Sequence, residues 1–337
     1  MKAWLRRWCW PIGKLLLALG ILLAVGRRFY LDLQDLDIEN LTLLPGWLAL
    51  SGVLYVLALG FSAGFWYRLL RVFGERPGRA AVIRAYYTGH LGKYVPGKAW
   101  ALLLRSALIR PAGVRLGVGV ITAFYEVLTT MAAGALLAAT IFLFQPPHVS
   151  GLAWNPVFTG LFLLCLLGIP LLPGVFNRLV NRLAARFQTV ESFRLPPLKN
   201  ATLAGGLLAT GCGWIVMGVS FWAVLQAVLL EPPAFTVPHW ANLVACLGLA
   251  YVAGFLVIVV PGGVGVREFV LLNLLGQGTN EPLYAAAILV LRLVWTAAEL
   301  IVAAIVYWFP VPLAKSPATP EESKESPATD NGLRTTG

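Results

Sequence analysis

Two proline-glycine motifs with charged neighbours are the parts of this chain best suited to chemistry. Proline interrupts a helix because it lacks an amide hydrogen and clashes with the preceding turn. A helix that restarts after such a break has unpaired amides at its N-terminus, which attract phosphate or carboxylate. The motifs therefore predict two anion-binding breaks, and the alternative is a pair of packing kinks. The candidate binding residues are Lys93, Tyr94, Pro96, Gly97, Lys98, Pro261, Gly262, Gly263, Gly265, Arg267 and Glu268.

Charged residues inside apolar stretches form a second group of candidates, namely Arg105, Glu126, Arg292 and Glu299. A charge at the centre of a bilayer costs on the order of 3 kcal/mol on insertion scales, so each must face protein or water. Arg292 and Glu299 share a helix face but are about two turns apart, too far to pair directly. Glu126 precedes Arg292 by about 166 residues, so we expect these two to face each other or to line one cavity. We also expect Arg267 to meet Glu299; the alternative for all of them is a structural ion pair.

The composition places these residues in a membrane protein. Of 337 residues, 58% are hydrophobic and 12% are charged, and the mean hydropathy is +0.77. A soluble domain carries about 25% charged residues, and a membrane span needs about 20 apolar residues. The spans predicted from the apolar runs are Pro11–Gly26, Trp47–Tyr67, Gly117–Phe144, Val157–Val175, Ala201–Leu230 and Pro282–Phe309.

The net charge of +11 has a topological explanation. Lysine and arginine gather in the N-terminal arm, after the second span and in the longest mid-chain connection, which marks these segments as cytoplasmic. We therefore expect both termini in the cytoplasm and no nucleic-acid partner. Three arginines at helical spacing suit anionic lipid headgroups, although ordinary positive-inside charge explains them equally well: Arg178, Arg182 and Arg186.

An internal repeat is predicted by landmarks at nearly constant offset. The two breaks lie about 165 residues apart, Gly46-Trp47 and Gly213-Trp214 about 167, and Thr130 and Thr296 about 166. If each break returns to its own side, each half has three crossings plus a re-entrant broken-helix hairpin, and the halves are inverted. The rival topology has Trp240–Val260 and Val264–Leu275 as full crossings, and the second of these is short for a span.

The expected fold is thus an all-α polytopic membrane protein with two inverted repeats in a single transmembrane domain, residues 1–309. Repeat one covers about 1–145 and repeat two about 146–309. The tail, 310–337, is rich in proline, serine, threonine and glutamate and is expected to be disordered in the cytoplasm.

The two breaks in their contexts, Gly92 to Trp100 and Pro261 to Glu268, resemble the paired motifs of the lysylphosphatidylglycerol synthase transmembrane-region family. This family includes the flippase domain of the multiple peptide resistance factors and standalone membrane proteins. The resemblance covers about Leu15 to Phe309. Lys98 departs from the glycine-rich form common after the first Pro-Gly, which leaves the ligand there open.

The resemblance implies a flippase-like carrier that moves a phosphate-containing lipid between leaflets of a bacterial cytoplasmic membrane. Candidate lipids are a phospholipid, an aminoacyl-phosphatidylglycerol or an isoprenoid-linked sugar. We expect the aminoacyl transferase domain of full-length synthases to be missing, so we expect no enzyme and no cofactor. A membrane-embedded transferase with Glu126 or Glu268 as general base is the first alternative, and a non-transporting envelope-assembly partner is the second. Membrane lipids are the expected partners, and a second copy of the chain is a further candidate.

Overall fold

The computed structural model describes residues 43–94, 99–147, 155–186, 196–257, 265–275 and 281–308, and all regular structure in these residues is helical. The all-α prediction is confirmed for this part of the chain. The short 3-10 helices are η2 (Leu91–Tyr94), η3 (Arg110–Ala112) and η4 (Ile169–Leu171). The α-helices are α2 (Pro45–Val72), α3 (Arg79–His90), α4 (Ala99–Ile109), α5 (Leu116–Phe144), α6 (Pro156–Gly168), α7 (Pro173–Arg186), α8 (Asn200–Val228), α9 (Val237–Leu256), α10 (Val266–Leu275) and α11 (Glu281–Tyr307).

The long apolar helices make this a multi-pass membrane protein. Among the described helices, α2, α5, α8, α9 and α11 are long and apolar enough to cross a bilayer, and the bent pair of α6 and α7 is a sixth candidate. Four predicted spans coincide with α2, α5, α8 and α11 within a few residues. The predicted first span, Pro11–Gly26, and the tail, 310–337, lie outside the described residues.

The predicted span Val157–Val175 is not a single straight helix. Pro156–Leu171 and Pro173–Arg182 meet at a bend of 57°. Pro170 lies within η4 and Pro173 starts α7, and neither proline has an amide hydrogen to continue a helix ladder. The predicted span is therefore two helices that meet at a bend, and α7 runs in a different direction from α6.

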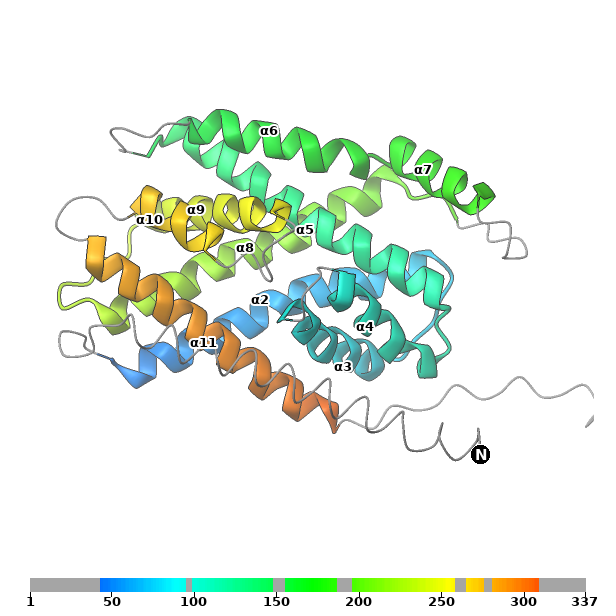
Figure 1. The fold of residues 1–337 in the computed structure, drawn as a ribbon, viewed down its shortest axis with the longest axis horizontal. Helices are drawn as coiled ribbons and strands as arrows, with labels where there is room; N and C mark the ends of the chain where they lie inside the picture. Colours follow the sequence, from blue (N-terminus) through cyan, green and yellow to red (C-terminus); the bar gives the residue numbers. More distant parts are fainter. Residues whose placement is uncertain are drawn as a thin grey trace, which may run out of the picture.

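The long helices pack side by side in a bundle (Figure 1). Helices α2 and α8 run antiparallel, since Ser51 Oγ lies 2.8 Å from Ser220 Oγ while a Cβ on Gly213 would meet the Ala58 carbonyl at 3.0 Å. Near the middle of the bundle, the Trp214 indole donates a 2.8 Å hydrogen bond to the carbonyl oxygen of Thr130. These are the middle residues of α8 and α5, so the bond marks the mid-level of the bundle.

Two helical hairpins end near this mid-level. In the first, α3 packs on α4 so closely that a Cβ on Gly89 would come within 2.7 Å of the Arg105 backbone. Its tip reaches the middle of α11, where Tyr94 Oη donates a 3.0 Å hydrogen bond to Thr296. In the second hairpin, α9 packs on α10, and the ring of Tyr251 lies 5.8 Å from that of Trp214. Helix α9 ends five residues later, at Leu256.

The hairpins lie toward opposite ends of the long helices (Figure 1). The end where α2 finishes and α8 starts carries most of the basic residues of the described chain, among them Arg68, Arg71, Arg115 and Lys199. We call it the basic end. The chain enters and leaves the α3–α4 hairpin at this end, between α2 and α5. It enters and leaves the α9–α10 hairpin at the other end, between α8 and α11.

Two of the three repeat landmarks fall at comparable places in the helices. Thr130 and Thr296 lie near the middles of α5 and α11, and each donates to the carbonyl oxygen four residues earlier, that of Glu126 at 3.0 Å and that of Arg292 at 2.8 Å. The breaks both separate two helices of a hairpin. The two Gly-Trp pairs do not lie at comparable places, because Trp47 is in the first turn of α2 whereas Trp214 is in the middle of α8.

Candidate functional site

The carboxylate of Glu299, on α11, is the most heavily bonded polar group at mid-level. Its side chain is 2% exposed. It accepts hydrogen bonds from Lys93 Nζ and from Tyr55 Oη, and another of 2.8 Å from Tyr94 Oη. His90 Nε2 lies 3.5 Å away. These donors come from α2, from the end of α3 and from η2, so Glu299 joins the tip of the first hairpin to the bundle.

A second buried ion pair links the returning arm of this hairpin to α5. Arg105 donates to Glu126 at 2.6 Å, and both side chains are 2% exposed. Tyr86 Oη donates to the same carboxylate at 3.2 Å, and the Arg105 guanidinium lies 4.2 Å from the Tyr86 ring centroid. The charge of Arg105 is therefore paired with a carboxylate and stacked on an aromatic ring, while its buried Nε, like that of Arg267, has no hydrogen-bond partner within the described part of the chain.

A third ion pair joins the second helix of the second hairpin to the long helix that follows it, as Arg105–Glu126 does in the first, but the acid and the base have exchanged helices. Arg292 on α11 donates to Glu268 on α10 at 2.6 Å, whereas in the first hairpin α5 carries the acid and α4 the base. The backbone amide of Gly265 donates to the other oxygen of Glu268 at 2.6 Å. Gly265 precedes α10 with φ +83°, a left-handed conformation that favours glycine. The predicted bare amide at Gly265 thus holds the protein's own carboxylate, in the manner of a capping box.

Arg267 has no comparable acidic partner. Its guanidinium carbon lies 3.9 Å from the centroid of the Tyr251 ring, and its buried Nε has no hydrogen-bond partner within the described part of the chain. The absence of a side chain at Gly254 makes room for it, because a Cβ there would meet Arg267 Cγ at 2.6 Å. A cavity of about 40 Å³ adjoins this side chain, and its lining includes Tyr251, Arg267, Glu268, Leu291 and Arg292.

The structure brings the predicted charges together, but in different pairs. Glu126 and Arg292 do not pair with each other, because each takes a partner from the hairpin of its own half. Arg267 does not pair with Glu299, which takes Lys93 instead. The predicted residues outside the described chain are Pro96, Gly97, Lys98, Pro261, Gly262 and Gly263.

The tyrosines are the functional candidates that sequence reasoning missed. Tyr55, Tyr86 and Tyr251 each lie beside one of the charged groups. A tyrosine within an apolar helix could have indicated a nearby polar group, because a buried hydroxyl needs a hydrogen-bond partner. His90, whose Nε2 lies 3.5 Å from Glu299, was also not among the predicted site residues.

Comparison with known families decides what kind of protein this is. The model of the lysylphosphatidylglycerol synthase transmembrane region matches residues 12–309. The chain belongs to this family. No curated protein matches it. This match confirms the resemblance seen in the two Pro-Gly motifs. The lysylphosphatidylglycerol synthase transmembrane region is a membrane domain linked to flippase-like handling of lipids.

The site of this family member carries an excess of positive charge. Where the hairpin tips approach each other, the described cations are Lys93, Arg267 and Arg292, and the carboxylates are Glu268 and Glu299. Lys93 is within electrostatic reach of both arginines. Counted over these described residues alone, three cations face two carboxylates. An anionic group entering this region would find a guanidinium that is not yet neutralised.

Proposed function

We propose that this family member is a flippase-like carrier that moves a phosphate-containing lipid between the leaflets of a bacterial cytoplasmic membrane. The observation that carries the proposal is Arg267, a guanidinium at mid-level held by an aromatic ring and by no carboxylate of the described chain. An unpaired charge inside a bilayer is costly, which makes such a residue a candidate for function. A lipid phosphate supplies the missing negative charge and matches the fork of a guanidinium.

Glu268 marks the place that the phosphate would take. Its carboxylate bridges Arg292 and the amide that precedes α10, which is how an anion binds at a helix N-terminus. The adjoining cavity, at about 40 Å³, is large enough for a water molecule but too small for a lipid headgroup. Headgroup binding therefore requires Glu268 to move away from Arg292 and the described side chains that line the cavity to separate.

The placement of the hairpins supports alternating access. Both tips lie near mid-level while the hairpins open at opposite ends of the bundle, as inverted repeats with re-entrant helices require. Rocking one half against the other would expose Arg267 to each leaflet in turn while the acyl chains remain in lipid. The basic end is assigned to the cytoplasm by the positive-inside rule, which places both termini there.

Helix α7 fits an interfacial role at the same end. Arg178 and Arg182 are exposed, and so are Val175 and Leu179 on the same short helix. A helix that exposes arginine and apolar side chains together suits the boundary between headgroups and acyl chains. We assign anionic lipid headgroups as the ligands of Arg178 and Arg182; the side chain of Arg186 lies outside the described part.

The transferase alternative receives less support from the site. Glu126 and Glu268, the two candidate general bases, are both held by arginine at 2.6 Å. Both oxygens of each carboxylate already accept a hydrogen bond from the protein, which leaves neither group free to contact a substrate. No described feature favours the assembly-partner alternative either, so the carrier is the function we put forward.

The test is lipid translocation in reconstituted vesicles. Vesicles are loaded with phosphatidylglycerol labelled on its acyl chain, and an impermeant reductant reports the share of label that reaches the outer leaflet. We expect wild-type protein to move the label, Arg267→Gln to abolish movement and Arg267→Lys to retain a part of it. Arg71→Gln, which removes an exposed arginine at the basic end of α2, is the matched control and keeps full activity. Full activity in a folded Arg267→Gln variant rejects the proposal.

A further inference from the structure

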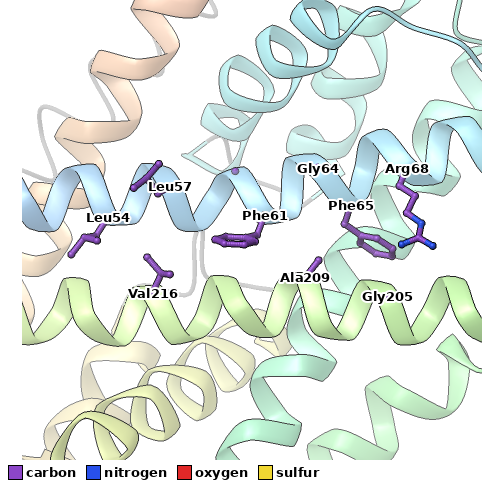
Figure 2. A pocket seen from close by; sticks show the side chains of 10 residues that line it. Leu54, Leu57, Phe61, Gly64, Phe65, Arg68, Gly205, Ala209 and Val216 are labelled. Atoms are coloured by element: carbon purple, nitrogen blue, oxygen red, sulfur yellow. The ribbon is translucent and has the colours of Figure 1, made fainter. Parts of the chain in front are cut away.

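A long apolar groove lies on the surface between α2 and α8, away from the hairpin tips. Its volume is about 740 Å³. Side chains of α2 line one wall at positions that recur every three or four residues, which is one face of a helix. Small residues of α8 form much of the other wall (Figure 2). Residues that define the groove are Leu54, Phe61, Gly64, Arg68, Gly205 and Ala209.

The groove is longer than one leaflet. From Leu54 to Arg68 the helix rises about 21 Å at 1.5 Å per residue, whereas half of a hydrocarbon core measures about 15 Å. The middle of α2 lies between Ala58 and Leu59, so the groove starts about 7 Å before this point and covers about 14 Å from there to Arg68. The part of the groove on the side of the basic end therefore has the length of an acyl chain in that leaflet.

Arg68 closes the groove at the basic end, and the other residues that line it are apolar or glycine. No ion pair joins Arg68 to an acidic residue in the described chain, and its Nη1 lies over Gly205, where a Cβ would come within 2.8 Å. Figure 2 shows the guanidinium at the end of the row of apolar side chains. An apolar channel that ends in a cation has the polarity of an anionic phospholipid.

The cation at its end decides between a lipid and a protein as the occupant of the groove. Helices α2 and α8 touch along their lengths, as Ser51 with Ser220 and Gly206 with Phe65 show. Another helix can pack over such a pair, as α5 and α11 do, but an apolar helix would leave Arg68 without a negative charge. An anionic phospholipid supplies both an acyl chain for the apolar walls and a phosphate for Arg68.

We propose that this groove binds one acyl chain of an anionic phospholipid from the leaflet at the basic end, with the phosphate at Arg68. The site is separate from the hairpin tips, and its occupancy does not depend on transport. Gly64 is the position that controls access, because a Cβ there meets nothing within 4 Å and a larger side chain would project into the groove without touching the backbone.

The experiment uses the full chain in nanodiscs that contain phosphatidylglycerol with a photoreactive group in the acyl chain. Cross-linked peptides are mapped by mass spectrometry, with photoreactive phosphatidylcholine as the uncharged comparison. We expect labelling at Phe61 and Ala209, stronger for phosphatidylglycerol than for phosphatidylcholine. Gly64→Leu should reduce this labelling at least fivefold, whereas Gly211→Leu, on α8 outside the groove with nothing within 4 Å, should leave it unchanged. Arg68→Gln should remove the preference for phosphatidylglycerol, and Arg71→Gln should keep it.

Several outcomes would overturn the site. Equal labelling in Gly64→Leu and wild type means that the lipid lies elsewhere, and equal labelling by the two lipids means that Arg68 selects no charge. Cross-links between two protein chains at Phe61, lost in Gly64→Leu, assign the groove to a second copy. Because the readout is binding, a failure here leaves the translocation test of Arg267 untouched.

Discussion

Glu299 on α11 accepts a hydrogen bond from Lys93, which stands 206 residues earlier, next to the first break. This contact joins the tip of the α3–α4 hairpin to the last long helix of the other half. It has no counterpart in the second hairpin at an equivalent position, since the residue of α5 about 166 positions before Glu299 is Ala133. The two halves are therefore linked at mid-level by an ion pair that, among the described residues, only the first hairpin forms. If a carrier opens between the halves, either this ion pair breaks or the end of the first hairpin moves together with α11.

Removing the charge of Glu299 should release the first hairpin. Glu299→Gln leaves Lys93 without a carboxylate, and breaking a buried pair in this way costs about 3–5 kcal/mol. We expect amide hydrogen exchange at residues 86–94 to rise by about a hundredfold or more, since each 1.4 kcal/mol is tenfold. Glu75→Gln serves as the control, because Glu75 is 8% exposed but its partner Arg115 is 56% exposed and lies far from the first hairpin's contact with Glu299, so exchange at residues 86–94 should change little. Unchanged exchange in Glu299→Gln would mean that the pair does not dock the hairpin.

The Arg105–Glu126 pair should behave as a structural unit. Glu126→Leu alone leaves a buried guanidinium and should lower the free energy of unfolding by about 3–5 kcal/mol, whereas Arg105→Met together with Glu126→Leu should recover most of it. A double-mutant cycle on thermal unfolding in detergent measures the coupling. Additive losses in the double variant would contradict a direct pair. Translocation by a folded double variant would show that these charges support the fold and do not line the route.

Helices α5 and α9 should tolerate no side chain where they cross. A Cβ on Gly248 would meet the Gly134 carbonyl oxygen at 2.6 Å, and backbone cannot move aside as a flexible side chain can. We expect Gly248→Ala to destabilise the protein by about 1–3 kcal/mol, the usual cost of overpacking. Gly211→Ala, on α8 with nothing within 4 Å, should be neutral or slightly stabilising. Equal unfolding temperatures for the two variants would place the crossing elsewhere.

Neutralising Glu268 should strengthen the binding of phosphatidylglycerol, whereas neutralising Arg267 should weaken it. Glu268→Gln removes the internal carboxylate that competes for Arg292 and for the Gly265 amide. Hydrogen bonds to charged groups contribute about 1.5–3 kcal/mol, so we expect phosphatidylglycerol to bind about tenfold or more tightly. Titration of detergent-solubilised protein with phosphatidylglycerol, followed by native mass spectrometry, measures this. Weaker binding by Glu268→Gln would show that Glu268 does not occupy the phosphate position.

The sequence predicted the features that depend on local pattern. Long apolar runs located α2, α5, α8 and α11, because about 20 consecutive apolar residues have few other uses. Each Pro-Gly motif falls between two described helices, η2 and α4 in the first case and α9 and α10 in the second, while the motifs themselves lie outside the described residues. Thr130 and Thr296 each lie one turn after a charged residue of a long helix, and the inverted repeat inferred from them stays a prediction.

Features that depend on contacts between distant segments were predicted less well. Glu126 and Arg292 were expected to face each other or to line one cavity, but each forms an ion pair with a residue from the hairpin of its own half. Tyr55 was not considered, because nothing within its own helix indicates that it lies beside Glu299, 244 residues away. The bend between α6 and α7 was missed because hydropathy continued across Pro170 and Pro173, although both prolines were visible.

The most direct test of the central claim is whether a lipid phosphate lies beside Arg267. Solid-state NMR on protein with ¹⁵N-labelled arginine in phosphatidylglycerol bilayers measures proximity between guanidinium nitrogen and lipid ³¹P. A membrane-impermeant paramagnetic ion in the water removes the signal of surface arginines. We predict a remaining ³¹P-coupled guanidinium signal that Arg267→Gln abolishes and Arg71→Gln retains. A remaining signal that is the same in Arg267→Gln and wild type, or no coupling at all, would contradict the account.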